Sequence, residues 1–276
     1  MFFQLNLVRC IEVRQLINDV PILLSEEKQR EYLDEAGGTM EQIYASMASE
    51  KQPSLRDRFF YKVDSLAQRG GDYRSDDSRN AFRSMVAQHQ PGDLFLSIGG
   101  GPLRIPKLVN LNIGLFQNVD VVGDAYLLPY ADGSVDAIYC EAVLEHLEYP
   151  NQATSEMFRT LRPGGQVFAA TPFLQAFHAF PNHFQNFTLI GHQRLFERAG
   201  FDIVSSGVCV GPTYTFVDLS ALYFQYLPTR VFSQLAPRII RLLGSLIRPM
   251  DRILNNRNSG AHLLASTTYV HAIKPD

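Results

Sequence analysis

The chain has 276 residues, enough for one large α/β domain or for one domain with appendages, and its 46% hydrophobic and 19% charged residues exclude a disordered or collagen-like protein. The formal net charge of −3 argues against the strongly basic surface that nucleic-acid binding needs, so we expect no nucleic-acid partner. The charge is unevenly spread along the chain. Residues 91–220 carry 6 basic and 12 acidic side chains, whereas residues 221–276 carry 7 basic and 2 acidic ones.

The amino-terminal part, residues 1–90, is predicted to be a helical lid or cap. Residues 1–8 lack the basic segment of a signal peptide, and no apolar run of the chain reaches membrane-spanning length. Residues 12–88 are charged and mostly helical in pattern, with a polar break at 69–79. The aromatic residues Tyr44, Phe59, Phe60 and Tyr61 lie in this part and would close over a ligand.

Short apolar strands alternate with helical stretches in residues 91–209, which predicts a mostly parallel, doubly wound Rossmann-like sheet of seven strands. Asn151 is a candidate N-cap for a helix that ends at 162–165, and Thr188 for a helix that ends at Gly200. The predicted strands are 94–98, 108–113, 119–122, 135–140, 166–171 and 203–208, with a last strand at 267–273.

The third part, residues 210–276, is predicted to be a helical insertion followed by the final core strand. A helix over 237–254, bounded by Pro237 and Pro249, places a stripe of arginines on one face: Arg238, Arg241, Arg248 and Arg252. This helix is a candidate for contact with an anionic membrane or a partner. The alternative is a helix whose apolar face packs on the core and whose arginines are solvated.

The three cysteines, Cys10, Cys140 and Cys209, are far apart in the sequence. They suggest neither a disulfide framework nor a metal knuckle, so we expect a cytoplasmic protein without a bound metal.

A glycine cluster follows the first core strand, at the end where open α/β sheets place their ligands. Gly99, Gly100 and Gly101 would let the backbone approach a ligand without interference from Cβ atoms. The cluster is neither a Walker loop nor a complete dinucleotide fingerprint, and by itself a tight structural turn would explain it equally well.

Five linked motifs resemble those of class I S-adenosylmethionine-dependent methyltransferases of the methyltransferase 11 type, in their order and spacing. They are the residues 119–125, 128–130, 132–136, 140–146 and 161–165. Residues 171–175, 187–188 and 195–201 are further similar to a bacterial subgroup associated with glycan and natural-product pathways. The resemblance implies S-adenosylmethionine as cofactor and a small molecule as substrate.

Carried over to this sequence, the resemblance implies a cofactor site built from four segments. Gly99, Gly100 and Gly101 would meet the amino-acid part of the cofactor, and Asn112 its ribose. Asp124 and Ala125 would meet the adenine, although an aspartate in such a turn also commonly caps it. Glu141 would face the methionine part or the substrate.

The acceptor site is expected in the loop after the fifth core strand. His178 and His183 are candidate bases there, and His146 is either a third base or a hydrogen-bonded packing residue. Asn182 and Tyr214 are candidate substrate contacts, Tyr214 alternatively being part of the core.

The sequence also departs from the family pattern. Ser97 and Asn112 stand where acidic residues are usual, and His183 and Asn186 replace the aspartate and arginine of the subgroup motif Pro-x-Asp-Tyr-x-Arg-Phe-Thr. We therefore expect a methyltransferase with a diverged acceptor site, acting on a hydroxyl or amine of a sugar or secondary metabolite. Two alternatives are an enzyme that transfers or cyclises the aminocarboxypropyl group of the same cofactor and a non-catalytic, membrane-proximal scaffold.

Overall fold

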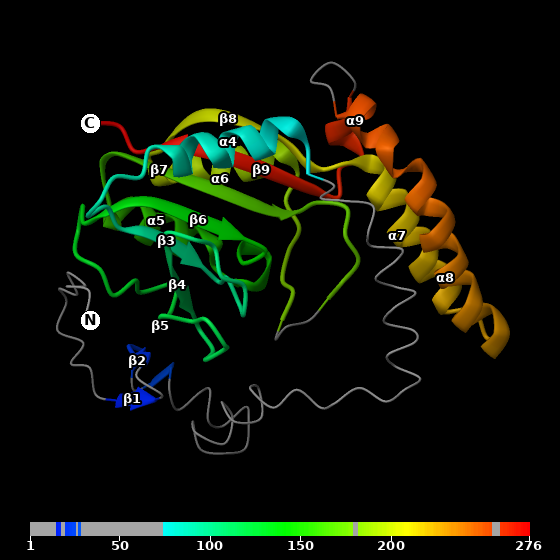
Figure 1. Ribbon diagram of the computed structural model, residues 1–276, viewed down its shortest axis with the longest axis horizontal. Coiled ribbons are helices and arrows are strands. Elements are labelled where there is room, and N and C mark those ends of the chain that lie inside the picture. The colour runs from blue at the N-terminus through cyan, green and yellow to red at the C-terminus, as the bar shows by residue number, and fades with distance from the viewer. Residues whose placement is uncertain (1–14, 18–19, 26, 29–73, 179–181, 256–259) are drawn as a thin grey trace.

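The computed structural model describes residues 15–17, 20–25, 27–28, 74–178, 182–255 and 260–276. They form a nine-stranded sheet in the order β1-β2-β5-β4-β3-β6-β7-β9-β8 (Figure 1). All pairs from β2 to β7 in this order are parallel, whereas β1 and β9 run antiparallel to their neighbours. The mostly parallel open α/β sheet predicted from the sequence is confirmed, with two strands more than the seven expected.

The core strands lie close to their predicted positions. β9 has the predicted bounds, β5 is shorter than expected, and β7 begins five residues earlier because residues 161–165 are strand rather than the end of a helix. The bounds are β3 Phe95–Ile98, β4 Leu108–Asn112, β5 Val121–Val122, β6 Val135–Glu141, β7 Leu161–Pro172, β8 Asp202–Val210 and β9 Thr267–Ile273.

The two faces of the sheet are covered by different helices because side chains alternate between the faces of a strand. Leu96 and Ile138 pack with residues of α5, Pro150–Thr160, and α6, Leu189–Ala199. Their neighbours Phe95 and Tyr139 point the other way, into a cluster with α4, Asp76–Ala87. Two apolar layers therefore bury both faces of the central strands.

The helix starts were predicted with mixed success. Thr188 caps α6 by accepting from the backbone N–H of Gly191, and Gly200 ends that helix with φ +104°, as expected. Asn151 is not the cap of α5, because Pro150 takes the first helical position and Tyr149 the capping one. Ser75 caps α4, which begins inside the predicted polar break.

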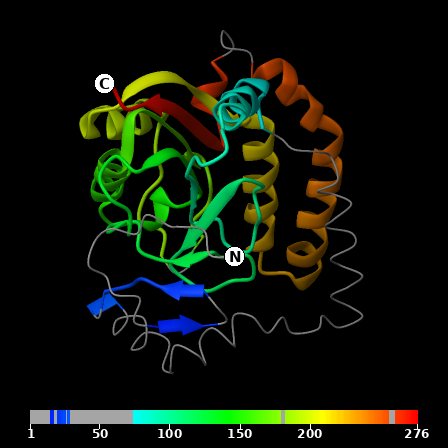
Figure 2. The ribbon, with the colours of Figure 1, turned by 60° about the vertical axis from the view of Figure 1, so that its left-hand side comes forward.

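Parts of the predicted amino-terminal lid belong to the sheet layers instead. β1, Gln15–Ile17, and β2, Val20–Ile22, extend the sheet beside β5 (Figure 2), and α4 packs on its face. The prediction of helix was wrong for these two strands. Tyr44, Phe59, Phe60 and Tyr61, on which the lid prediction depends, lie outside the described residues.

A helical hairpin lies at the end of the sheet where β8 ends and β9 begins (Figures 1 and 2). It consists of α7, Pro212–Gln225, and α8, Arg230–Ile247, followed by the short helices η2, Arg248–Met250, and α9, Asp251–Leu254. η3, Ala261–Leu263, then leads into β9. Among the described helices, none has both the length and the apolar content to cross a bilayer.

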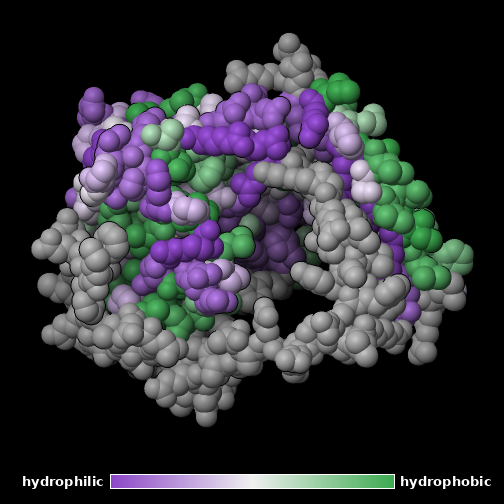
Figure 3. All heavy atoms as spheres, viewed as in Figure 1, coloured by the Kyte–Doolittle hydropathy of each residue, from purple (hydrophilic) through white to green (hydrophobic). Residues whose placement is uncertain are grey.

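The structure of the hairpin contradicts the prediction of one exposed arginine stripe. Pro237 lies inside α8 and does not begin it. Arg248 is buried, 5.8 Å from the ring centroid of Tyr214, and the Arg241 guanidinium lies 3.8 Å from the Asp218 carboxylate of α7. The exposed face of α8 is instead apolar, including Leu242, Leu243 and Leu246, and appears as a green band along the hairpin in Figure 3.

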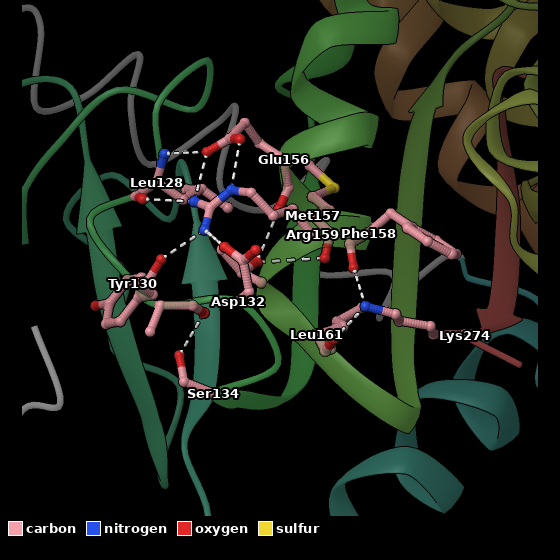
Figure 4. Close-up of polar contacts among 12 residues, drawn as sticks. Leu128, Tyr130, Asp132, Ser134, Glu156, Met157, Phe158, Arg159, Leu161 and Lys274 are labelled. Atoms are coloured by element: carbon pink, nitrogen blue, oxygen red, sulfur yellow. Dashed lines mark hydrogen bonds and ion pairs between the residues drawn. The ribbon is translucent and has the colours of Figure 1, made fainter. Parts of the chain in front are cut away.

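An arginine on α5 ties this helix to the loop between β5 and β6 (Figure 4). The Arg159 guanidinium donates to the carbonyl oxygens of Leu128 at 3.0 Å and Tyr130 at 2.9 Å, and pairs with Glu156 at 2.7 Å. Glu156 in turn accepts from the backbone N–H of Leu128. The network fixes the segment that follows the acidic turn at Asp124.

Candidate functional site

The glycine loop after β3 is shaped for close backbone approach. Gly99 and Gly101 have φ values of +71° and +55°, which side chains other than glycine rarely adopt. A Cβ at Gly99 would lie 2.2 Å from Cγ2 of Val143, whereas a Cβ at Gly101 would point into open space. Gly99 thus packs on the turn after β6, whereas Gly101 has open surroundings.

Asn110 on β4 holds this loop and was not among the predicted site residues. Its amide donates to the carbonyl oxygens of Gly101 at 2.9 Å and Asn118 at 3.0 Å. Within the part of the chain that the structure describes, its buried Oδ1 and the buried Oγ of Ser97 have no hydrogen-bond partner. Both oxygens lie beneath Gly100, where a Cβ would come within 2.6 Å of Asn110 Oδ1 and 2.9 Å of Ser97 Oγ, so this position admits only glycine without a rearrangement. No local sequence signal marks these two residues, because the register that places Ser97 opposite Asn110 is known only from the structure.

The predicted adenine and ribose contacts lie on the next two strand ends. Asp124 is half-buried and its Oδ1 accepts from the backbone N–H of Tyr126 at 2.9 Å, so it caps its turn. Ala125 is buried directly after it. Asn112 is buried and its Oδ1 accepts from the N–H of Gly114 at 3.2 Å. The structure places all three at the carboxyl edge of the sheet.

Glu141 has a role that the sequence did not predict. Its carboxylate lies 2.6 Å from the Arg74 guanidinium and accepts from the Tyr139 hydroxyl, because Tyr139 and Glu141 point to the α4 face of β6. Burial favours neutral Tyr139 and raises the pKa of its hydroxyl, and the neighbouring carboxylate adds to this. Glu141 thus ties Arg74, two residues before the start of α4, to the sheet, and its carboxylate is engaged in that ion pair.

The three histidines predicted as bases come together at the carboxyl ends of β6 and β7. His146 lies in η1, Leu144–His146, and His178 and His183 in the loop after β7. The ring centroids of His146 and His178 are 5.2 Å apart, and those of His178 and His183 are 4.4 Å apart. Residues separated by more than 30 positions therefore form one cluster.

Hydrogen bonds distinguish the roles of these rings. Nδ1 of His183 accepts from the backbone N–H of His178 at 3.1 Å, so its Nε2 carries the proton and donates to Asn186 Oδ1 at 2.7 Å. Both nitrogens of His183 are thereby engaged, and this ring supports the loop rather than acting as a base. His146 Nδ1 lies 2.5 Å from the carbonyl oxygen of Asn182, so Asn182 positions a histidine through its backbone.

Glu145 joins this cluster and was missed as a site residue. Its side chain is fully buried, with Oε1 3.8 Å from Nε2 of His146 and 4.0 Å from Nε2 of His178. Oε2 accepts from the Thr171 hydroxyl at 3.2 Å. Burial raises the pKa of Glu145 from its ordinary value, partly offset by these hydrogen bonds and by the histidines. Only its place directly before His146 could have drawn attention to it in the sequence.

Tyr214 has structural contacts in the hairpin. Its backbone N–H donates to Asp251 Oδ2 at 3.4 Å, and its ring lies beneath Arg248. The described contacts of Tyr214 therefore belong to the base of the hairpin, and none of them joins it to the histidine cluster.

Comparison with known proteins gives a match for a segment that contains part of this site. Residues 106–169 match a family model described as a methyltransferase domain. A Mycolicibacterium smegmatis protein described as an S-adenosylmethionine-dependent methyltransferase is 36% identical over 95 residues, 32% of this chain and 37% of the relative. A chloroplastic methyltransferase of Arabidopsis thaliana, itself uncharacterized, is 46% identical over 54 residues, 20% of this chain and 15% of the relative.

The chain thus spans well under two thirds of the length of these relatives. Among solved structures, a Haloferax volcanii methyltransferase in complex with the Trm112 activator shares 15% identity, with 81% of this chain and 98% of that one covered and a TM-score of 0.45. Residues 106–169, which include β4, β5, β6 and most of β7, are thus similar to a methyltransferase domain, whereas the glycine loop and the loop after β7 lie outside the match.

Proposed function

We propose that the chain transfers a methyl group from S-adenosylmethionine to a hydroxyl or amine of a small molecule, in the class of sugars or secondary metabolites. The observation that carries this proposal is the contact between two functional segments. Gly99 packs on Val143, two residues before Glu145 and three before His146, so the cofactor loop adjoins the histidine cluster. A donor and an acceptor bound to these segments would be neighbours.

The residues around the glycine loop fit the cofactor. A Cβ at Gly101 would meet no atom within 4 Å, which leaves the backbone of the loop open to a ligand on that side. One oxygen of Asp124 caps the turn, and the other would accept from the adenine amine. When bound, S-adenosylmethionine supplies a methyl group on a sulfonium centre.

The chain itself would orient the acceptor and take its proton. Nδ1 of His146 and of His178 each lie at hydrogen-bond distance from a backbone carbonyl oxygen, which leaves Nε2 of both rings with a lone pair. These atoms would accept the proton of a hydroxyl or ammonium acceptor. The buried Glu145 carboxylate beside them would favour the resulting imidazolium.

Product analysis tests the proposal. The chain is incubated with S-adenosylmethionine and sets of sugar and secondary-metabolite acceptors, and the nucleoside products are separated by mass spectrometry. Methyl transfer gives S-adenosylhomocysteine, whereas methylthioadenosine would show chemistry on the aminocarboxypropyl group. Neither product with any acceptor, together with absent cofactor binding, would favour a scaffold.

A further inference from the structure

Three atoms that carry lone pairs converge at the carboxyl ends of β6 and β7. They are Glu145 Oε1, His146 Nε2 and His178 Nε2, and all lie within 4.8 Å of one another. Their separations of 3.8 and 4.0 Å from the carboxylate oxygen are too long for hydrogen bonds. The three groups thus face one another without direct bonding.

Contacts of the Nδ1 atoms with backbone carbonyl oxygens fix the orientations of the His146 and His178 rings. Nδ1 of His146 lies 2.5 Å from the Asn182 carbonyl oxygen, and Nδ1 of His178 lies 3.1 Å from that of Ala176. A carbonyl oxygen only accepts, so both Nδ1 atoms carry protons and both Nε2 atoms are unprotonated in the neutral rings. Histidines that bind metals characteristically donate their second N–H to such an oxygen.

Glu145 adds a buried carboxylate with one oxygen that makes no hydrogen bond to the described residues. Its side chain has no exposed surface, and among the described residues its Oε1 has no hydrogen-bond partner. An isolated buried carboxylate is costly unless a cation offsets its charge. Nothing in the described part of the cluster donates to this oxygen, so the charge calls for a cation between the three atoms.

We propose that Glu145, His146 and His178 bind a divalent transition-metal ion. Two imidazole nitrogens and one carboxylate oxygen suit zinc, cobalt and related ions, whereas calcium and magnesium prefer oxygen ligands. At bonds of about 2.1 Å, two ligand atoms lie about 3 to 4.2 Å apart, so a shift of under about 1 Å by the exposed His178 ring closes the site. The sequence, whose cysteines gave no metal pattern, predicted no such ion.

The site has room for further ligands. His178 is 42% exposed and lies in the loop expected to cover the acceptor, so the ion would keep positions open on that side. With the ion bound, Nε2 of His146 and His178 would be metal ligands and not proton acceptors. The hydroxyl of an acceptor molecule could occupy an open position and would lose its proton more easily there, a consequence that depends on the proposed methyl transfer. Binding of the ion itself does not depend on it.

The test measures metal binding without cofactor or acceptor. The protein, prepared without a histidine tag, is stripped of metal and titrated with Co²⁺ and Zn²⁺. Binding is measured by calorimetry and, for cobalt, by the visible absorption of the bound ion. We expect one ion per chain, and a loss of at least about 100-fold in affinity for Glu145→Gln and for His178→Ala. His262→Gln is the matched control, because His262 is an exposed histidine on η3.

His178→Ala alters an exposed loop residue, so we expect this variant to fold like the wild type. Circular dichroism checks that each variant is folded. Equal metal affinity in folded wild type, Glu145→Gln and His178→Ala would overturn the site, as would no binding by the wild type. Metal binding by a chain that forms no methylated product would leave this site standing and refute the proposed methyl transfer alone.

Discussion

Asp124 combines a structural and a proposed binding role that two substitutions separate. Asp124→Ala removes the turn cap on Tyr126 together with the acceptor for the adenine amine, whereas Asp124→Asn retains an oxygen for the cap. We expect both to weaken S-adenosylmethionine binding, Asp124→Ala by about 1.5–3 kcal/mol, the range for hydrogen bonds to charged groups. Only the alanine variant should also lower the melting temperature. Calorimetry and thermal unfolding check this, and unchanged affinity in folded Asp124→Ala would refute the adenine contact.

His192 should make the fold sensitive to acid. Its side chain is fully buried near Thr268, and burial lowers its pKa from 6.5 to about 3. Between these values the unfolded chain binds a proton that the folded chain does not, so the free energy of unfolding falls as pH drops below 6.5 and is unaffected above it. Between these two pKa values, the slope of the free energy of unfolding against pH approaches about 1.4 kcal/mol per pH unit.

Denaturant unfolding at pH 7.5 and 5.5 measures this effect. We expect His192→Gln to be less stable at pH 7.5 but to lose less stability between the two pH values than the wild type does. His262→Gln should keep the wild-type pH dependence, because that side chain is exposed. The same pH dependence in His192→Gln as in the wild type would contradict the assignment.

At the scale of secondary-structure elements, Arg159 joins α5 to the loop between β5 and β6. Its side chain is 16% exposed and bonds two carbonyl oxygens as well as Glu156, whereas its pair with the 75% exposed Asp132 contributes little. Arg159→Ala should lower the free energy of unfolding by about 3 kcal/mol, since it leaves the largely buried carboxylate of Glu156 without its cationic partner. Arg159→Lys should recover part of this loss, because it restores charge but not the planar fork. Urea titrations provide the measurement, and an alanine variant within about 0.5 kcal/mol of wild type would show that the network is not stabilising.

The sequence predicted those helices and strands whose ends depend on residues nearby in the chain. Thr188 and Gly200 bound α6 as expected, and the β-branched run of 267–273 forms β9. Contacts distant in sequence were not predictable in this way. Glu141 pairs with Arg74, 67 positions away, and the burial of Glu145 depends on the loop that returns after β7.

At the scale of the whole molecule, the hairpin presents apolar side chains where the sequence predicted arginines. Leu246 of α8 is 75% exposed, and Phe216 and Tyr223 of α7 are exposed as well. No acidic residue occurs between positions 219 and 250. We expect this surface to contact anionic membranes, with apolar side chains inserted among the headgroups.

Sedimentation with anionic vesicles tests the membrane contact. Leu246→Glu should lower partitioning about 30-fold, because burial of a leucine contributes about 2 kcal/mol and each 1.4 kcal/mol is about tenfold. Gln234→Glu is the control, since it introduces the same charge at an exposed polar position of α8. If the wild-type chain stays in the supernatant at low salt, the apolar surface does not bind lipid.

Binding of S-adenosylmethionine to the glycine loop is the central claim, and calorimetric titration tests it most directly. The account predicts saturable binding of one cofactor per chain, abolished in Gly101→Val because a branched side chain would enter the open space beside the loop. Gly92→Val should bind like the wild type, since Gly92 also has positive φ and open surroundings but lies before β3. Absent binding to the wild type, or equal binding by Gly101→Val, would contradict the account.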